Sequence, residues 1–209
     1  SISIPEGWIN HLDYWHGFSI AHPLGWSVET YQGSISVRQD PLGFTSAWIW
    51  PFNLPAPMTA HQVAEHFVRM SKAGNSTFQA WIQQNTSPET SRISLRTSAS
   101  KYGQLLSGTW NILVMDGTAN ISGYWAPSQK IAESSQILGT ILSTFETLEL
   151  MDRQSAFDPA ENAFSVQLPA SWSFSGGMNR NTIGGTGMPF FTISDTPSGS
   201  VAACMPNYS

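Results

Sequence analysis

The sequence holds little charge and almost no lysine. Charged residues make up 11% of its 209 residues, whereas about 25% is usual for a soluble domain. Lysine occurs only as Lys72, Lys101 and Lys130, the net charge is −5, and no run of basic residues is present. Because nucleic acids and anionic membranes are bound mainly through clustered lysine and arginine, the composition argues against both as partners.

Cysteine, long apolar runs and catalytic motifs are also scarce. Cys204 is the single cysteine, so the chain can form no intramolecular disulfide. No segment approaches the ~20 apolar residues that a membrane-spanning helix needs. The sequence contains no P-loop, dinucleotide-binding fingerprint or nucleophile elbow. We therefore expect no cofactor and no membrane span, and an enzyme is the less favoured interpretation.

The first residue is Ser1, and no signal peptide is recognisable. A surface poor in lysine and rich in serine and threonine favours an exported protein. We expect an extracytoplasmic or secreted protein, and a lipid anchor attached through a missing leader is part of that expectation.

What the sequence does contain is an internal repeat. The stretch GFSIAHPLGW at 17–26 returns as AFSVQLPASW at 163–172. The shared residues, at a constant offset along the chain, are Phe18, Ser19, Pro23 and Trp26, which return as Phe164, Ser165, Pro169 and Trp172. Phenylalanine and the β-branched residue two positions on alternate with polar residues, as in a half-buried strand, and the proline ends that strand. The stretch therefore predicts a hairpin whose tryptophan fills the core, present in two copies.

The pattern of apolar residues predicts one α+β domain over residues 1–150. Alternating runs predict strands near 35–37, 44–50, 78–82 and 92–96. The second of these strands is expected to end at Pro51. Asp116-Gly117, which lies between two longer alternating runs, predicts a β-hairpin with both residues at positive φ. Residues 1–16 show no clear period and are expected to form an arm laid over the domain, with its aromatic residues covering an edge.

Two helices are predicted in this domain. The first begins after Thr59, where Gln62 completes a capping box. Its apolar stripe is Val63, Ala64, Phe67 and Met70. The second helix is expected to be capped by Ser128 and to bury a face made by Ile131, Leu138, Ile141, Leu142 and Phe145.

The C-terminal part is predicted to be a polar linker at 151–162 followed by a partial, β-rich second repeat at 163–209. Four strands are expected there, with a glycine-rich turn at 182–187. A sheet of four strands without a helix leaves one apolar face uncovered. We therefore expect residues 163–209 to contact a protein partner or to form a homodimer.

The strand–Pro–x–Gly–Trp–strand opening at 17–26 resembles the first hairpin of the PsbP-like fold, and the likeness covers about residues 17–147. Photosystem extrinsic subunits, the bacterial lipoprotein DcrB and a Ran-binding nuclear transport factor share this fold. The resemblance implies an antiparallel sheet packed with helices, an α/β/α sandwich, in a group known for binding and assembly. No functional residue of these families maps onto this sequence.

Nine tryptophans are the most unusual feature of the composition. Trp15, Trp81 and Tyr124 each interrupt a local polar pattern, so we expect them to be exposed and to bind a ligand. The remaining tryptophans mostly lie on faces assigned to the core. The favoured hypothesis is a non-enzymatic accessory domain that binds a protein, and the exposed aromatic residues also suit a carbohydrate-binding module.

A metal site is the remaining alternative. His11, Asp13, His16 and His22 lie within twelve residues of one another. Imidazole and carboxylate are suitable ligands for zinc and similar ions, although this spacing matches no rigid motif. A metal-assisted hydrolase built on these four residues is therefore the enzymatic hypothesis.

Overall fold

A computed structural model describes residues 4–83, 91–150, 152–179, 188–195 and 200–204. The chain divides into two compact units. The first consists of Ser1–Asp13 and Phe18–Thr147, and the second of Tyr14–Gly17 and Leu148–Ser209.

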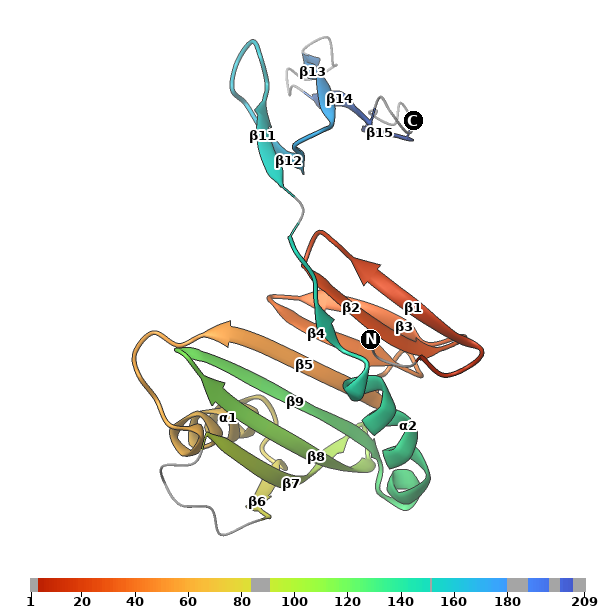
Figure 1. Ribbon diagram of the computed structural model, residues 1–209, viewed down its shortest axis with the longest axis vertical. Coiled ribbons are helices and arrows are strands. Elements are labelled where there is room, and N and C mark those ends of the chain that lie inside the picture. Colours follow the sequence, from red (N-terminus) through yellow and green to blue (C-terminus); the bar gives the residue numbers. More distant parts are fainter. Residues whose placement is uncertain (1–3, 84–90, 151, 180–187, 196–199, 205–209) are drawn as a thin grey trace. The chain divides into compact units, whose positions relative to one another are not determined.

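The first unit is built around an antiparallel sheet of seven strands in the order β3-β4-β5-β9-β8-β7-β6 (Figure 1). The strands are β3 (Ser27–Tyr31), β4 (Ser34–Arg38), β5 (Ser46–Asn53), β6 (Gln79–Ile82), β7 (Arg92–Lys101), β8 (Gln104–Met115) and β9 (Thr118–Pro127). The predicted hairpin joins β8 to β9, and its turn residues Asp116 and Gly117 have φ of 48° and 75°. This turn matches the right-handed twist of the strands. The α+β fold class predicted from the sequence is confirmed.

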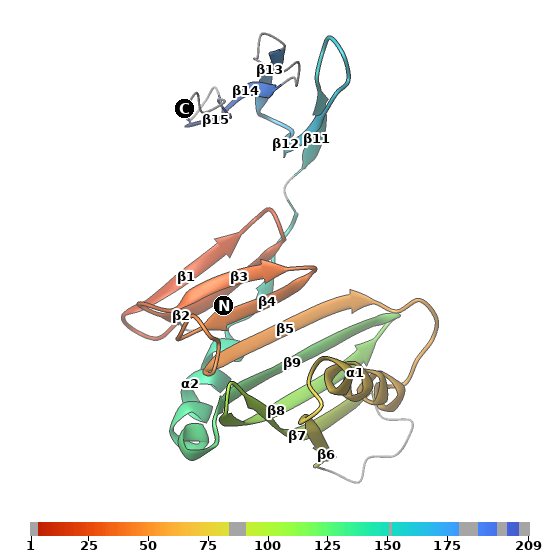
Figure 2. The ribbon, with the colours of Figure 1, turned by 180° about the vertical axis from the view of Figure 1, so that it is seen from behind.

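Two helices pack on opposite faces of this sheet. Helix α1 (Ala60–Gly74) buries Val63 and Phe67 against a core that includes Leu95 and Ile112. Helix α2 (Ile131–Ser143) follows a short 3-10 turn (Ser128–Lys130) and packs on the face that carries Ile49 and Ala126. Figure 1 shows α2 in front of the sheet, and Figure 2, from behind, shows α1 in front. We call these two faces the α1 face and the α2 face.

A second, smaller sheet contributes to the core under α2. It consists of β1 (Trp8–Asp13), β2 (Phe18–Pro23) and β10 (Glu146–Thr147), in the order β1-β2-β10. Phe18 and Ile20 are fully buried and share a core cluster with Leu138 and Ile141 of α2. Part of the arm expected over residues 1–16 is a regular strand, because Trp8–Asp13 pairs with β2 along its whole length.

The predicted hairpin at 17–30 is also wrong. β2 pairs with β1 and β10, whereas β3 pairs with β4 in the large sheet. Pro23 has no N–H to continue a ladder, and Gly25 takes a φ of 87° that turns the chain. The Trp26 N–H donates to the Pro23 carbonyl at 3.3 Å across this turn. The chain thus passes from one sheet to the other, and Trp26 is only partly buried at the edge of the core under α2.

Two details of the apolar pattern differ from expectation. β5 continues past Pro51 to Asn53. Its pairing with β4 ends at Ile49, so the proline lies on a free edge, where it is tolerated. Met70, assigned to the apolar stripe of α1, is exposed, because the buried face of this helix ends at Phe67.

The two predicted helix caps have different outcomes. At α1 the capping box is confirmed: the Gln62 N–H donates to Thr59 Oγ1 at 3.3 Å, and the Thr59 N–H donates to Gln62 Oε1 at 2.9 Å. At α2 the prediction was wrong, because the 3-10 turn separates Ser128 from the first residue of the helix. The Ser128 hydroxyl instead lies 2.8 Å from the hydroxyl of Ser107 on β8.

In its described residues, the second unit contains five strands. β11 (Arg153–Phe157) pairs with β12 (Ser165–Pro169), and β13 (Ser173–Asn179), β14 (Met188–Asp195) and β15 (Ser200–Cys204) form a three-stranded sheet. The segment predicted as a linker, 151–162, therefore contributes a strand, and the four expected strands belong to two sheets. The glycine-rich turn predicted at 182–187 lies outside the described residues.

The repeated sequence takes the same local structure in both units. In the second unit the Trp172 N–H donates to the Pro169 carbonyl at 3.0 Å, as Trp26 does to Pro23 in the first. β12 pairs with the strand that precedes it, as β2 does. The next strand, β13, belongs to a different sheet, as β3 does in the first unit. Phe164, Phe174 and Phe191 pack together next to this turn, with ring centroids 5.9–6.2 Å apart.

Candidate functional site

The α1 face of the large sheet carries several tryptophans. Trp48 of β5, Trp110 of β8 and Trp125 of β9 all point to this face, because their cross-strand partners place them on the same side of the pleat. A helix ~10–12 Å across covers only two or three strand spacings of ~4.8 Å, and α1 packs at the β6–β8 end. The helix therefore does not cover the rest of the α1 face.

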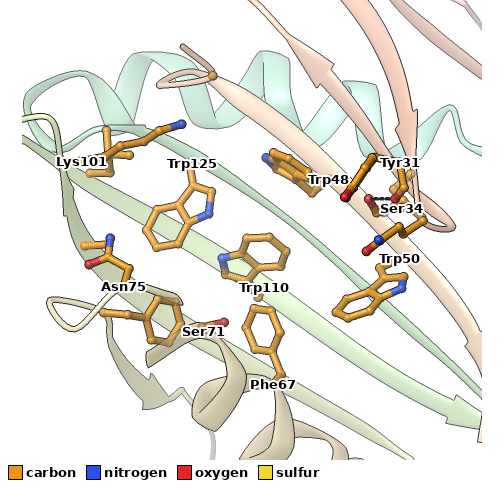
Figure 3. A pocket seen from close by; sticks show the side chains of 16 residues that line it. Tyr31, Ser34, Trp48, Trp50, Phe67, Ser71, Asn75, Lys101, Trp110 and Trp125 are labelled. Carbon is orange, nitrogen blue, oxygen red and sulfur yellow. Dashed lines mark hydrogen bonds between the residues drawn. The ribbon is translucent and has the colours of Figure 1, made fainter. Parts of the chain in front are cut away.

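This open part of the α1 face forms a cavity of about 440 Å³ (Figure 3). We call it the tryptophan groove. Its apolar walls are Trp48, Trp50, Trp110, Trp125, Phe67 and Phe78, with Ala99 and Leu106. Trp110 forms the floor and is 7% exposed, whereas Trp50 at the lip is 41% exposed.

Two glycines allow the indole rings to lie close to the sheet. Gly123 is the cross-strand partner of Trp110, and a Cβ there would lie 2.5 Å from Trp110 Cδ2 and 2.5 Å from the Thr109 carbonyl. Gly108 is the partner of Trp125, and a Cβ there would lie 2.3 Å from the Tyr124 carbonyl. Any larger residue would displace the backbone or the rings, so the aromatic floor depends on these glycines.

The rings of the floor pack edge to face. Trp110 and Trp125 have centroids 5.9 Å apart at 67°, and Phe78 lies 6.0 Å from Trp125 at 74°. Phe67 of α1 lies 5.0 Å from Trp110. Such pairs add ~0.5–1.5 kcal/mol each beyond the area they bury. The floor is therefore held in place before any ligand binds.

The polar groups of the groove lie at its ends and are mostly engaged within the protein. Figure 3 shows Lys101 at one end and Tyr31 with Ser34 at the other. The Lys101 ammonium donates to the Leu42 carbonyl, and the Ser34 hydroxyl donates to the Tyr31 carbonyl at 2.7 Å. Asn75 donates to the Ser100 carbonyl at 2.9 Å. The middle of the groove thus presents apolar surface.

Trp48 is fixed by its neighbours. Its indole N–H donates to Ser46 Oγ at 2.8 Å, and the guanidinium of Arg38 lies 5.2 Å from its ring centroid. Arg38 is held in turn by an ion pair with Glu29 at 2.8 Å. In contrast, Nε1 of Trp110 is buried without a hydrogen-bond partner among the described residues.

No family model matches the sequence, and no curated protein matches it. Solved structures do resemble it. Cyanobacterial PsbP (CyanoP) from Synechocystis sp. PCC 6803 matches with a TM-score of 0.49 and 12% identity, covering 68% of this chain and 94% of that protein. LpqN of Mycobacterium tuberculosis, involved in cell envelope biogenesis, matches with a TM-score of 0.40 and 14% identity, covering 71% and 82%.

A protein from Bacteroides thetaiotaomicron VPI-5482 matches with a TM-score of 0.37 and 14% identity, covering 70% of this chain and 51% of that one. The PsbP-like fold that the sequence resembles is thus found in the comparison of structures as well. Similarity at this identity concerns the fold alone.

The structure does not bring together the two predicted aromatic site residues that belong to the first unit. Trp81 on β6 is 53% exposed and lies on the α2 face. Tyr124 on β9 lies on the same face three strands away, ~14 Å by strand spacing, and packs partly buried against the core under α2. Trp15 belongs to the second unit, where the Arg153 guanidinium lies 4.3 Å from its ring centroid. A ligand-binding role for these residues stays a prediction.

The tryptophans of the groove were missed because their strands alternate like core strands. Trp48, Trp50, Trp110 and Trp125 share one face, which the sequence pattern assigned to the interior. The signal that could have found them is the width of that face. One fifteen-residue helix is too narrow to cover the α1 face of seven strands.

Two of the four candidate metal ligands are neighbours. His11 of β1 and His22 of β2 have ring centroids 6.5 Å apart, and His11 also stacks on Phe18 at 5.9 Å. His22 is buried, with Nδ1 2.9 Å from the Pro23 carbonyl oxygen. Within the described residues, no group of three or more His, Cys, Asp or Glu side chains is arranged to hold a metal ion. In the same residues, no helix is long and apolar enough to cross a membrane.

Proposed function

We propose that the first unit is a non-enzymatic binding domain that holds an apolar group of its ligand in the tryptophan groove. The observation that carries this proposal is a cavity of about 440 Å³ with aromatic walls and few polar groups. Ligand sites typically have volumes of ~300–1,000 Å³, apolar linings and a few polar groups that orient the ligand. The groove has each of these properties.

The lining offers little for catalysis. Among the described residues that line it, Lys101 and Tyr31 are the ionisable ones, and none of these residues is a carboxylate or an imidazole. General acid–base chemistry is carried out most often by His, Glu or Asp within hydrogen-bonding reach of the reacting atoms. The ammonium of Lys101 is also engaged with the Leu42 carbonyl. Its charge at the end of the groove suits an anionic or polar tail on an otherwise apolar ligand.

Trp50 provides the sharpest test. It lies at the lip of the groove and is 41% exposed, so its removal takes away ligand contact without opening the core. We expect Trp50→Ala to weaken binding of the neutral apolar probe N-phenyl-1-naphthylamine about tenfold, as truncation of an aromatic anchor does. Probe fluorescence, titrated with the full chain, measures the affinity.

Trp81→Ala is the matched control for this titration. It removes another exposed tryptophan, from the α2 face, and we expect the probe affinity to stay within twofold of the wild-type value. If the unsubstituted protein does not bind the probe, or if both variants lose affinity equally, the groove is not the ligand site.

A protein partner or a homodimer through residues 163–209 is a second candidate, which rests on an exposed aromatic residue. Phe190 of β14 is 45% exposed in the second unit. Large exposed apolar side chains on a small sheet favour contact with another chain. We expect the full chain to be dimeric by light scattering and Phe190→Ser to make it monomeric. Tyr102→Ser, at a 79% exposed site of the first unit, is the control. A monomeric unsubstituted chain would rule the homodimer out.

We also propose that the second unit is a partial second copy of the first. The shared turn, with its bond from tryptophan N–H to proline carbonyl, and the same pairing of successive strands support this. The low lysine content supports an extracytoplasmic location. The gene sequence upstream of Ser1 tests that location and the lipid anchor: an export leader with a lipidated cysteine is expected, and a cytoplasmic domain in its place would contradict both.

A further inference from the structure

The α2 face of the sheet differs from the α1 face in its chemistry at the β6–β8 end. There the three strands carry polar side chains, and α2 packs mainly over β9 and β5. We call this region the polar face. Its residues are Trp81 of β6, Arg92, Ser94, Arg96 and Ser98 of β7, and Ser107, Thr109 and Asn111 of β8.

Trp81 and Arg96 lie at the centre of the polar face. They are direct cross-strand partners, so their Cβ atoms are ~4.5–5.5 Å apart. Two hollows of about 530 and 460 Å³ adjoin them, and both residues line both hollows. The first extends over β7 and β8 to α2, where Ile131 and Ser135 close it.

The indole of Trp81 is available to a ligand. It is 53% exposed, although tryptophan is mostly buried in folded proteins. In the part of the chain that the structure describes, no cation lies over its ring. In contrast, the guanidinium of Arg38 lies over the ring of Trp48, and that of Arg153 over the ring of Trp15. A flat apolar surface of this kind can take the C–H face of a sugar ring.

The charge of the polar face favours an anionic ligand. The segments β6, β7 and β8 contain no Asp or Glu, although the protein as a whole has a net charge of −5. Arg92 and Arg96 point to this face, and no described carboxylate forms an ion pair with either. A guanidinium binds a carboxylate through two parallel hydrogen bonds, which fixes its orientation.

Hydroxyl groups lie near Arg96 on the polar face. Ser98 and Thr109 line the larger hollow, and their hydroxyls have no hydrogen-bond partner among the described residues. Ser94 is engaged, because it donates to Asn111 Oδ1 at 2.6 Å. Hydroxyls can both donate and accept, which suits the hydroxyl groups of a saccharide.

From these observations we infer that the polar face is a second binding site, for a saccharide that carries a carboxylate. The sugar ring stacks on Trp81, its carboxylate pairs with Arg96, and its hydroxyls meet Ser98 and Thr109. Single-stranded nucleic acid would also use an aromatic ring and an arginine, but it is bound by several stacked aromatics in a basic groove. The polar face has one aromatic ring, and the protein is acidic.

Calorimetric titration of the full chain with oligogalacturonate tests the inference. We expect Trp81→Ala and Arg96→Gln each to weaken binding about tenfold, the usual effect of losing a charged hydrogen bond or an aromatic anchor. Neutral malto-oligosaccharide is expected to bind at least tenfold more weakly than oligogalacturonate, with no further loss in Arg96→Gln.

Two variants on the α1 side serve as controls. Trp50→Ala removes an exposed tryptophan from the groove, and Arg69→Gln removes one positive charge from α1, so both should leave oligogalacturonate affinity unchanged. The proposal would be overturned if the unsubstituted chain did not bind oligogalacturonate, or if Arg69→Gln lost as much affinity as Arg96→Gln. Tighter binding of an oligothymidylate that Trp81→Ala abolishes would also overturn it, since the face would then bind nucleic acid. These outcomes are independent of binding in the tryptophan groove.

Discussion

Gly123→Ala is expected to destabilise the first unit by about 3 kcal/mol, the upper part of the usual range for overpacking a filled interior. A Cβ at this position would lie 2.5 Å from Trp110 Cδ2 and 2.5 Å from the Thr109 carbonyl. The indole cannot move away freely, because Phe67 and Trp125 pack against it at 5.0 and 5.9 Å. The strands β8 and β9 must therefore separate, or the groove floor must rearrange.

Gly139→Ala is the matched control and should raise the free energy of unfolding instead of lowering it. Gly139 lies inside α2, and a Cβ there would meet no atom within 4 Å. Because alanine is the better helix former, we expect a gain of ~0.5–1 kcal/mol. Urea denaturation of both variants measures the two free energies of unfolding. Equal effects of the two substitutions would show that the Trp110–Gly123 contact does not constrain the sheet.

Trp110→Ala is expected to cost ~3–5 kcal/mol, as large-to-small changes in a core typically do. Trp110 is 7% exposed and contacts the rings of Phe67 and Trp125. Its removal would open the groove floor to solvent on the side of α1.

Trp81→Ala deletes the same side chain from an exposed position and should cost less than half as much. Chemical denaturation compares the two directly, and the Trp110→Ala variant should also lose its affinity for N-phenyl-1-naphthylamine. Similar stabilities of the two variants would mean that Trp110 does not support the sheet.

Much of the large sheet could be predicted because its signals are local. Asp116-Gly117 fixes the β8–β9 hairpin through two residues at positive φ, and Thr59 with Gln62 fixes the start of α1. Alternation of Ile93 and Leu95 with arginine and serine identifies the buried side of β7. Each of these features is decided within a few residues of chain, so propensity and periodicity suffice.

The other features depend on contacts that are distant in sequence. Whether β2 pairs with β3 is decided by β1 and β10, which compete for the edges of β2. Ser128 does not cap α2: a 3-10 turn separates it from the helix, and its hydroxyl lies against that of Ser107 on β8.

The groove illustrates the same limit. Its walls come from β5, β8, β9 and α1, and it exists because α1 is narrower than the sheet. The period of each strand shows which side chains share a face, but not how much of that face a helix will cover.

The most direct test of the tryptophan groove follows the nine indole N–H signals of the full chain, labelled with ¹⁵N-tryptophan, as N-phenyl-1-naphthylamine is added. Single Trp→Phe variants assign the signals. We expect concerted shifts at Trp48, Trp50, Trp110 and Trp125, and stationary signals at Trp8, Trp15, Trp26, Trp81 and Trp172. Shifts confined to this second group, or spread evenly over all nine, would contradict this expectation.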